Sequence, residues 1–165
     1  MLACRGNPHE LPSVGLHFDY LPQVLAECGV TKHFHRLAQR PGKPLWFGTH
    51  PQAVVFALPG NPVSSLVCAH RYVQPYVRTC LGIEAPPAYA ILTEDFTFQP
   101  SLTYFLQVAV RISDQGQLLA TPFIGQGSGD FANLRHATGI LELPAAESTF
   151  SAGRRYRYWD YGEGL

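Results

Sequence analysis

The chain has no excess charge of either sign, since twelve lysine and arginine residues balance twelve aspartate and glutamate residues. A protein without net charge has no long-range field that would hold nucleic acid or an anionic membrane. The sequence also lacks any apolar run of about 18 residues, the length of a membrane-spanning helix, and its opening lacks the pattern of a signal peptide. We therefore expect a cytoplasmic protein that binds neither nucleic acid nor membranes, and any anion site on it must be local.

Cysteine is sparse as well. The four cysteines, Cys4, Cys28, Cys68 and Cys80, are widely spaced and form no Cys-x-x-Cys pair. That pair is the usual mark of zinc and redox sites, so the spacing favours neither a metal site nor a disulfide framework. We expect reduced cysteines that are mostly packed inside the protein.

The first half of the chain alternates between helical and strand patterns, which predicts an α/β domain. Residues 1–16 contain Gly, Pro and Asn without periodicity and are assigned no element. In residues 20–28 the apolar positions recur at helical spacing, and Gly29 supplies the stop. Three strands that we expect to be buried in an α/β sheet follow, and then a helix in which Pro75 predicts a kink: strands 31–38, 45–47 and 53–58, and helix 62–80.

The second half of the chain has a different sequence pattern, without convincing helical periodicity. The run Ala85-Pro86-Pro87 marks a domain boundary near residue 85. Beyond it, short segments rich in β-branched and aromatic residues alternate with turn residues, which is typical of a small β-barrel or sandwich. Residues 114–117 form a turn signal between two of the strands. The predicted strands are 88–98, 103–113, 118–123, 139–143 and 155–161.

The stretch 58–65, with the sequence LPGNPVSS, follows an apolar strand and opens a helix. Such a turn directs unpaired backbone N–H groups and the positive end of the helix dipole toward one point, and Ser64 can add a hydroxyl donor. This is an arrangement for binding an oxyanion. The alternative is an ordinary helix start, with Asn61 as N-cap and Pro62 at the first position, whose loop binds nothing.

A second turn, RPGKP at residues 40–44, places a guanidinium three residues from an ammonium. Arg40 can hold a phosphate or another tetrahedral oxyanion through a planar fork, and Lys43 acts on it as a point charge. The pair would complement the helix start at Asn61. The alternative is that both are surface residues of an exposed turn, which is common for basic side chains.

Two further groups of side chains have simple structural interpretations. His33 and His35 lie two apart on a predicted strand, but no third ligand accompanies them, so we favour partly buried strand histidines over a metal site. A set of aromatic residues could form a stacking surface for single-stranded nucleic acid, but the neutral charge and the strand spacing favour a barrel core. These residues are Tyr104, Phe105, Tyr156, Tyr158 and Trp159.

The order of the motifs resembles the MoeA family of molybdopterin molybdenumtransferases, which includes the E domain of gephyrin. FDY at 18–20, RPGKP at 40–44 and LPGNPVS at 58–64 match the family patterns GGVSxGxxDY, KPGKP and LPGNPVS in order and spacing. Segments 103–106 and 126–131 resemble the terminal β-barrel domain. The resemblance implies the C-terminal part of such a protein: a partial MogA-like α/β domain at 17–84 and a small all-β barrel at 85–165.

The resemblance also implies an activity. The family inserts molybdate into adenylylated molybdopterin and releases AMP, as a homodimer that uses Mg²⁺. The expected partners are therefore small-molecule substrates and a second copy of the complete protein.

The residue roles implied by the resemblance follow position by position. Asp19 matches the acidic residue near the divalent cation, although it could equally be a helix N-cap. Lys43 is the second catalytic candidate, and Ser128 falls in the barrel segment that borders the pocket. The residues expected to bind substrate oxyanions are Arg40, Lys43, Pro59, Gly60, Asn61, Pro62, Ser64 and Ser128.

The sequence departs from the family pattern at several points. Arg40 replaces a lysine, and Leu102 stands where many members carry an arginine; residues 13–18 lack the GGV segment. The alternative interpretation is accordingly a catalytically inactive remnant or an interaction module with the same fold.

Overall fold

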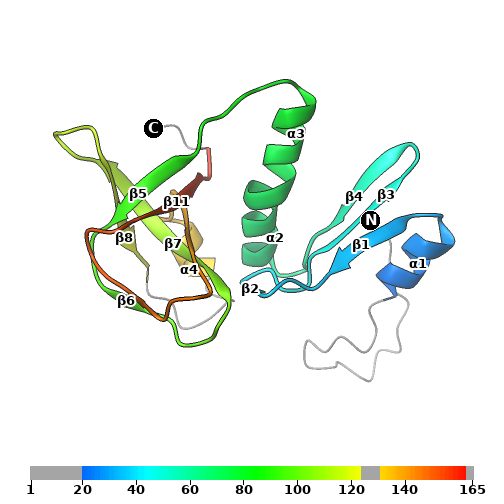
Figure 1. Ribbon diagram of the computed structural model, residues 1–165, viewed down its shortest axis with the longest axis horizontal. Helices are drawn as coiled ribbons and strands as arrows, with labels where there is room; N and C mark the ends of the chain where they lie inside the picture. Colours follow the sequence, from blue (N-terminus) through cyan, green and yellow to red (C-terminus); the bar gives the residue numbers. More distant parts are fainter. Residues whose placement is uncertain (1–19, 124–130, 163–165) are drawn as a thin grey trace. The chain divides into compact units, whose positions relative to one another are not determined.

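The computed structural model describes residues 20–123 and 131–162 (Figure 1). The chain divides into two compact units. One comprises the residues up to 35 together with 46–57, and the other comprises 36–45 together with everything from 58 onward. Among the described residues, no helix is long and apolar enough to cross a membrane.

The smaller unit combines one short helix with a three-stranded sheet, visible in blue to cyan in Figure 1. The helix ends as predicted, because Gly29 adopts a φ of 77° and its N–H donates to the carbonyl of Ala26 at 3.0 Å. The sheet has the order β1-β3-β4 with antiparallel pairing throughout. The elements are α1 (Leu21–Glu27), β1 (Thr31–His35), β3 (Trp46–His50) and β4 (Ala53–Ala57).

The expectation that all three strands are buried is wrong for β1 and β4, which are partly exposed. Only two residues, 51 and 52, connect β3 to β4, and so short a connection permits only antiparallel pairing. The first three residues of β1 and the first two of β4 are exposed. The predicted first strand is also shorter than expected, ending at His35.

The larger unit begins with β2 (Gln39–Arg40) and then contains a long helical segment. Asn61 caps this segment as predicted, with its side chain accepting the N–H of Ser64 at 3.1 Å. Gly82, with a φ of 69°, follows its end. The segment consists of α2 (Pro62–Cys68), the π-helical turn η2 (Ala69–Val73) and α3 (Gln74–Cys80).

The interruption expected at Pro75 takes the form of this π-helical turn. Pro75 stands in the first turn of α3, where its missing N–H removes no helical hydrogen bond. The wide turn directly before it absorbs the change in hydrogen-bond pattern. A single continuous α-helix over 62–80 is therefore replaced by two helices with a π turn between them.

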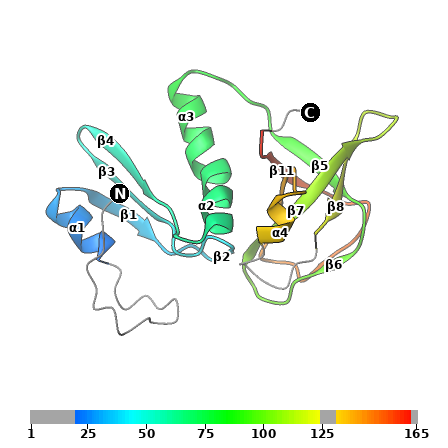
Figure 2. The same ribbon diagram turned by 180° about the vertical axis from the view of Figure 1, so that it is seen from behind.

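The rest of the larger unit is the predicted barrel (Figure 2). Its strands follow the order β7-β8-β5-β11-β9, and an additional pairing of β7 with β9 closes the barrel; β2 joins β7 in parallel. Gly116, with a φ of 73°, forms the predicted turn between β7 and β8. The elements are β5 (Ala88–Leu92), β6 (Phe96–Thr97), β7 (Thr103–Ile112), β8 (Leu118–Pro122), α4 (Phe131–Leu134), β9 (Gly139–Leu143), β10 (Thr149–Phe150) and β11 (Arg155–Asp160).

The barrel interior forms one hydrophobic cluster. Leu106, Val108, Leu141, Phe150 and Tyr158 are all at most 2% exposed and belong to it. The outer face contributes a second cluster that includes Phe105 and Ile140 together with a residue of α2, Val67. The aromatic residues singled out in the sequence thus serve mainly as core, as expected.

The cysteines are less buried than expected. Cys68, on α2, is fully buried, but Cys28 and Cys80 are exposed. Cys28 follows the last residue of α1 and Cys80 ends α3, and helix ends of this kind leave a side chain in solvent. The expectation of mostly packed cysteines is therefore wrong for two of the three cysteines in the described part of the chain.

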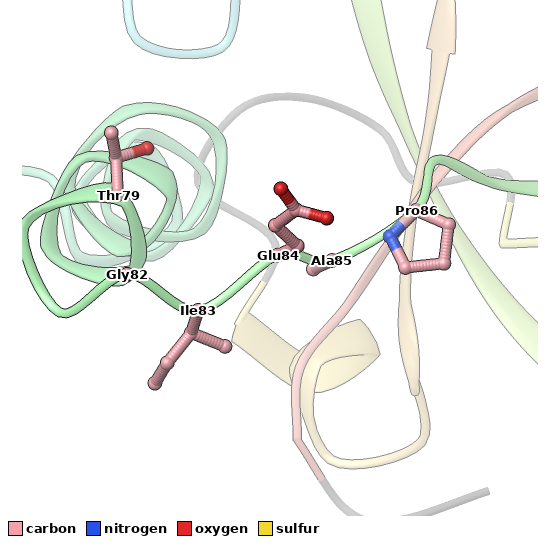
Figure 3. A pocket seen from close by; sticks show the side chains of 6 residues that line it. All are labelled: Thr79, Gly82, Ile83, Glu84, Ala85 and Pro86. Atoms are coloured by element: carbon pink, nitrogen blue, oxygen red, sulfur yellow. The ribbon is translucent and has the colours of Figure 1, made fainter.

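The link between α3 and β5 borders an open pocket of about 590 Å³, lined only by Thr79 and residues 82–86 (Figure 3). Ile83 and Glu84 point to opposite sides of the chain there. The lining contains no cation and neither of the sequence motifs, so we assign it no function.

Candidate functional site

The turn at residues 40–44 is anchored to the barrel by β2. Gln39 lies opposite Thr103 and Arg40 opposite Tyr104 in the parallel pairing of β2 with β7. The peptide bond between Arg40 and Pro41 is cis, and the carbonyl of Gly42 accepts the N–H of Leu45 at 3.1 Å. The side chains of Arg40 and Lys43 are exposed, so this anchored turn presents both cations to solvent.

Gly42 packs the same turn against α2. The Sγ atom of Cys68 lies 3.8 Å from the carbonyl oxygen of Gly42, and a Cβ atom on Gly42 would fall 2.7 Å from that sulfur. Gly42 also has a φ of 94°, a conformation that favours glycine. The glycine of the RPGKP motif therefore has a packing role: it lets the turn approach the helix.

Gln39 reinforces this contact, and sequence reasoning did not identify it. It is only 3% exposed. Its Nε2 donates to the carbonyl of Pro41 at 3.2 Å and lies 3.8 Å from Sγ of Cys68, while its Oε1 accepts from the hydroxyl of Tyr72. One buried amide thus ties the turn to α2 and η2. The only signal available in the sequence was a polar residue directly before the motif.

The loop before α2 satisfies most of its own polar groups. Besides accepting the N–H of Ser64, Oδ1 of Asn61 lies 3.4 Å from the Ser64 hydroxyl. The hydroxyl of Ser65 donates to the carbonyl of Pro59. Gly60 is exposed, and no atom lies within 4 Å of the position that a Cβ would take. The geometry is that of a capped helix start, in which Ser64 is turned toward its own cap.

The two motifs adjoin the same side of α2. Ser64 is 6% exposed and Cys68 is fully buried, and residues four apart on a helix lie on one face. Gly42 contacts this face at Cys68, one helical turn, or about 6 Å, from Ser64. The structure therefore brings the basic turn and the LPGNPVS segment, which are some 20 residues apart in sequence, to one helix.

The titratable neighbours of the turn carry no charge at neutral pH. Burial raises the pKa of the Cys68 thiol to about 11 and that of Tyr72 to about 12. Burial likewise raises the pKa of Tyr104, against the opposing effect of the nearby Arg40. Within the described part of the chain, no ion pair neutralises the charge of either Arg40 or Lys43.

Other residues predicted for the site are placed differently or lie outside the described residues. Asp19 and Ser128 belong to the latter group, and the N-cap position of α1 is occupied by Tyr20. Leu102, at the position where many family members carry arginine, packs against the barrel core.

The described residues do not supply a metal site. Within 20–123 and 131–162, no group of three or more His, Cys, Asp or Glu side chains is arranged to hold a metal ion. His33 lies 2.7 Å from the hydroxyl of Thr49. It is exposed, whereas His35 is half-buried, so the expectation of partly buried strand histidines is wrong for His33. The expected Mg²⁺ therefore depends on Asp19, which lies outside the described residues.

Two family models match the chain. A probable molybdopterin binding domain matches residues 15–79, and the MoeA C-terminal region (domain IV) matches residues 89–160. The two matches fall on either side of the link between α3 and β5.

Curated relatives and solved structures agree with these matches. The chain is 44% identical over 144 residues to a molybdopterin molybdenumtransferase of Synechocystis sp., covering 86% of this chain and 35% of the relative. It is 32% identical to the protein of that name from Bacillus subtilis, covering 86% and 33%. The crystal structure of a molybdopterin biosynthesis MoeA protein from Pyrococcus horikoshii is similar with a TM-score of 0.62 and 25% identity, covering 80% of this chain and 33% of that one.

Proposed function

This chain belongs to the MoeA family of molybdopterin molybdenumtransferases, and from that premise we propose that it serves the insertion of molybdate into adenylylated molybdopterin with release of AMP. Molybdenum cofactor biosynthesis is the process in which the family acts. The chain spans about a third of the length of the curated relatives that it matches. The complete reaction is therefore a proposal for the whole protein to which this segment corresponds.

One observation carries the proposal: Arg40 and Lys43 are cations without an ion pair to any described residue, on a turn that is packed against α2. Both substrates bear oxyanions, and cleaving the bond to AMP builds up negative charge on phosphate oxygens. Preorganised cations stabilise such charge without moving during the reaction. The contacts of Gly42 and Gln39 supply that preorganisation, because they fix the turn on both sides of the arginine.

Each proposed site residue has a distinct part. Arg40 would grip the oxyanion through its planar fork, and Lys43 would act as a point charge. Ser64 would contribute a hydroxyl once it turns from Asn61. The roles proposed for Asp19, as the residue near Mg²⁺, and for Ser128 rest on the family resemblance alone. We further propose the domain limits 17–84 and 85–165, a homodimer of the complete protein and a cytoplasmic location.

A second candidate function is an inactive remnant or an interaction module with the same fold. The packing of Leu102 into the barrel core favours it, because a leucine there provides no contact for an anion. The two candidates differ in whether the cations of the turn act on substrate.

The test is molybdate-dependent release of AMP from adenylylated molybdopterin by the purified chain. We expect Lys43→Ala to reduce release by roughly a hundredfold, the usual cost of removing a group that stabilises an oxyanion. Lys32→Ala is the matched control, since Lys32 is also exposed but lies on β1. Equal losses in the two variants would contradict the proposed role of the turn. A folded chain that releases no AMP would favour the interaction module for this chain, which spans about a third of the length of its relatives.

A further inference from the structure

A row of polar and aromatic side chains crosses the outside of the barrel, apart from the site described above. On neighbouring strands, Arg157 of β11 lies directly opposite Tyr89 of β5 on one side and Glu142 of β9 on the other. Trp159, two residues further along β11, is on the same face, because side chains alternate along a strand. These residues border a groove of about 590 Å³ that also includes Arg71 of η2.

Glu142 is fully engaged by partners other than Arg157. Its Oε1 accepts from Nη2 of Arg71 at 3.2 Å. Its Oε2 lies 2.9 Å from Nε of Arg71 and accepts the indole N–H of Trp159 at 2.9 Å. The charge of Arg71 is thereby neutralised, and the carboxylate has its strong acceptor positions occupied.

Arg157 lies near two aromatic rings and has no anionic partner among the described residues. Its guanidinium carbon lies 4.6 Å from the ring centre of Trp159 and 5.8 Å from that of Tyr89, within the range of cation–π contacts. Its Nε is buried and has no hydrogen-bond acceptor among the described residues, and no described carboxylate forms an ion pair with it. Leaving a buried donor of a charged group without an acceptor costs free energy. The groove therefore presents one positive charge that lacks an anionic partner among the described residues.

The rings decide how that charge can be approached. The Trp159 and Tyr89 rings lie beside the guanidinium, and in its own plane two parallel N–H groups match a carboxylate. Tyr89 is 53% exposed, so part of its ring remains open to solvent and can take a stacked ligand ring.

We propose that this groove binds a small organic anion, with its carboxylate on Arg157 and a planar ring on Tyr89. Neither the RPGKP turn nor the LPGNPVS segment lines this groove, although Thr103 at its border pairs with Gln39 of β2. The net charge of one favours a monoanion, and the exposed tyrosine favours a ligand with a ring over a bare ion.

The experiment is a titration of the purified chain with benzoate, followed by NMR through the indole N–H signal of Trp159. Benzamide keeps the ring without the charge, acetate keeps the charge without the ring, and inorganic phosphate tests a bare tetrahedral anion. We expect benzoate to shift the signal at the lowest concentration and benzamide to have little effect.

Variants locate the binding. Arg157→Gln should weaken benzoate binding at least about tenfold, since a hydrogen bond to a charged group is lost, and Arg157→Lys should restore only part of it. Arg155→Gln is the matched control, because Arg155 is an exposed arginine of the same strand outside the groove. Tyr89→Ala should reduce the affinity for benzoate to that for acetate.

Several results would overturn the proposal. Equal affinities for benzoate and benzamide would show that the negative charge of the ligand does not contribute to binding. Tighter binding of phosphate than of benzoate would show that the groove does not select an organic anion. Equal losses in Arg157→Gln and Arg155→Gln would indicate general charge attraction. Because every measurement is of binding, a negative result here leaves the AMP-release test of the transferase proposal unaffected.

Discussion

Gly42 and Cys68 approach so closely that no side chain fits between them: a Cβ on Gly42 would lie 2.7 Å from Sγ of Cys68 and 2.6 Å from Nε2 of Gln39. This contact joins the basic turn to α2 and so orders the cations that the proposed function requires. It also gives the glycine of the motif a mechanical role that can be tested apart from any chemistry.

Replacing Gly42 by alanine should destabilise the chain by roughly 2–4 kcal/mol. Overpacking of a well-packed site costs about 1–3 kcal/mol, and a non-glycine residue at a φ of 94° adds strain of about 1 kcal/mol or more. Gly60→Ala is the control, since a Cβ there would meet no atom within 4 Å. Urea unfolding of both variants measures the difference, and equal stabilities would show that the Gly42 contact is not tight in solution.

Removing the cap of α2 should have a smaller effect. Asn61→Ala deletes the acceptor for the N–H of Ser64 and should lower the free energy of unfolding by about 1 kcal/mol. Asn61→Asp keeps an acceptor at the helix N-terminus and should retain most of the stability. If alanine and aspartate at this position gave the same midpoint in urea, the cap would not stabilise the helix.

The three described cysteines should differ sharply toward alkylating reagents. Only the thiolate reacts, and Cys68 is both fully buried and held protonated by a pKa raised to about 11 through burial. Cys28 and Cys80 are exposed. Iodoacetamide at pH 8 followed by peptide mass spectrometry should label these two and spare Cys68, which should react once urea unfolds the chain. Labelling of Cys68 at the rate of Cys80 would contradict the buried position.

The same thiol predicts a loss of stability in alkaline solution. Because burial raises the pKa of Cys68 from 9.0 to about 11, the folded chain keeps a proton that the unfolded chain releases between these values. The contribution is fully present below pH 9 and declines as the pH rises toward 11. Unfolding measured at pH 8 and pH 10.5 should show a larger decrease for the natural chain than for Cys68→Ala, in which the tyrosines still titrate. Parallel decreases would exclude this role of the thiol.

Features governed by neighbours in sequence were predictable. The cap at Asn61, the stops at Gly29 and Gly82 and the turn at Gly116 all depend on backbone preferences within a few residues. Strand β9 was predicted with its observed limits, 139–143, because its aliphatic residues, interrupted only by Glu142, lie between Gly139 and Pro144. By contrast, the two-residue strands β2 and β10 were missed, since so few residues carry no periodicity.

Features governed by contacts across the chain were not predictable. The sheet of the smaller unit is partly exposed where buried strands were expected, since the apolar content of a strand does not show what covers it. Gln39 was overlooked although it is almost fully buried, because its importance arises from Tyr72 and Cys68, which are 33 and 29 residues away.

The sequence by itself determined the local elements and, through the order of its short motifs, the family to which the chain belongs. These depend on residue types at fixed spacings, which the sequence states directly. Only the tertiary structure decided that β7 and β9 close the barrel and that Gly42 meets Cys68. It also decided that Glu142 neutralises Arg71, while Arg157 has no anion among the described residues. Each of these contacts joins residues that are far apart in the sequence. It therefore forms only when those distant segments pack together.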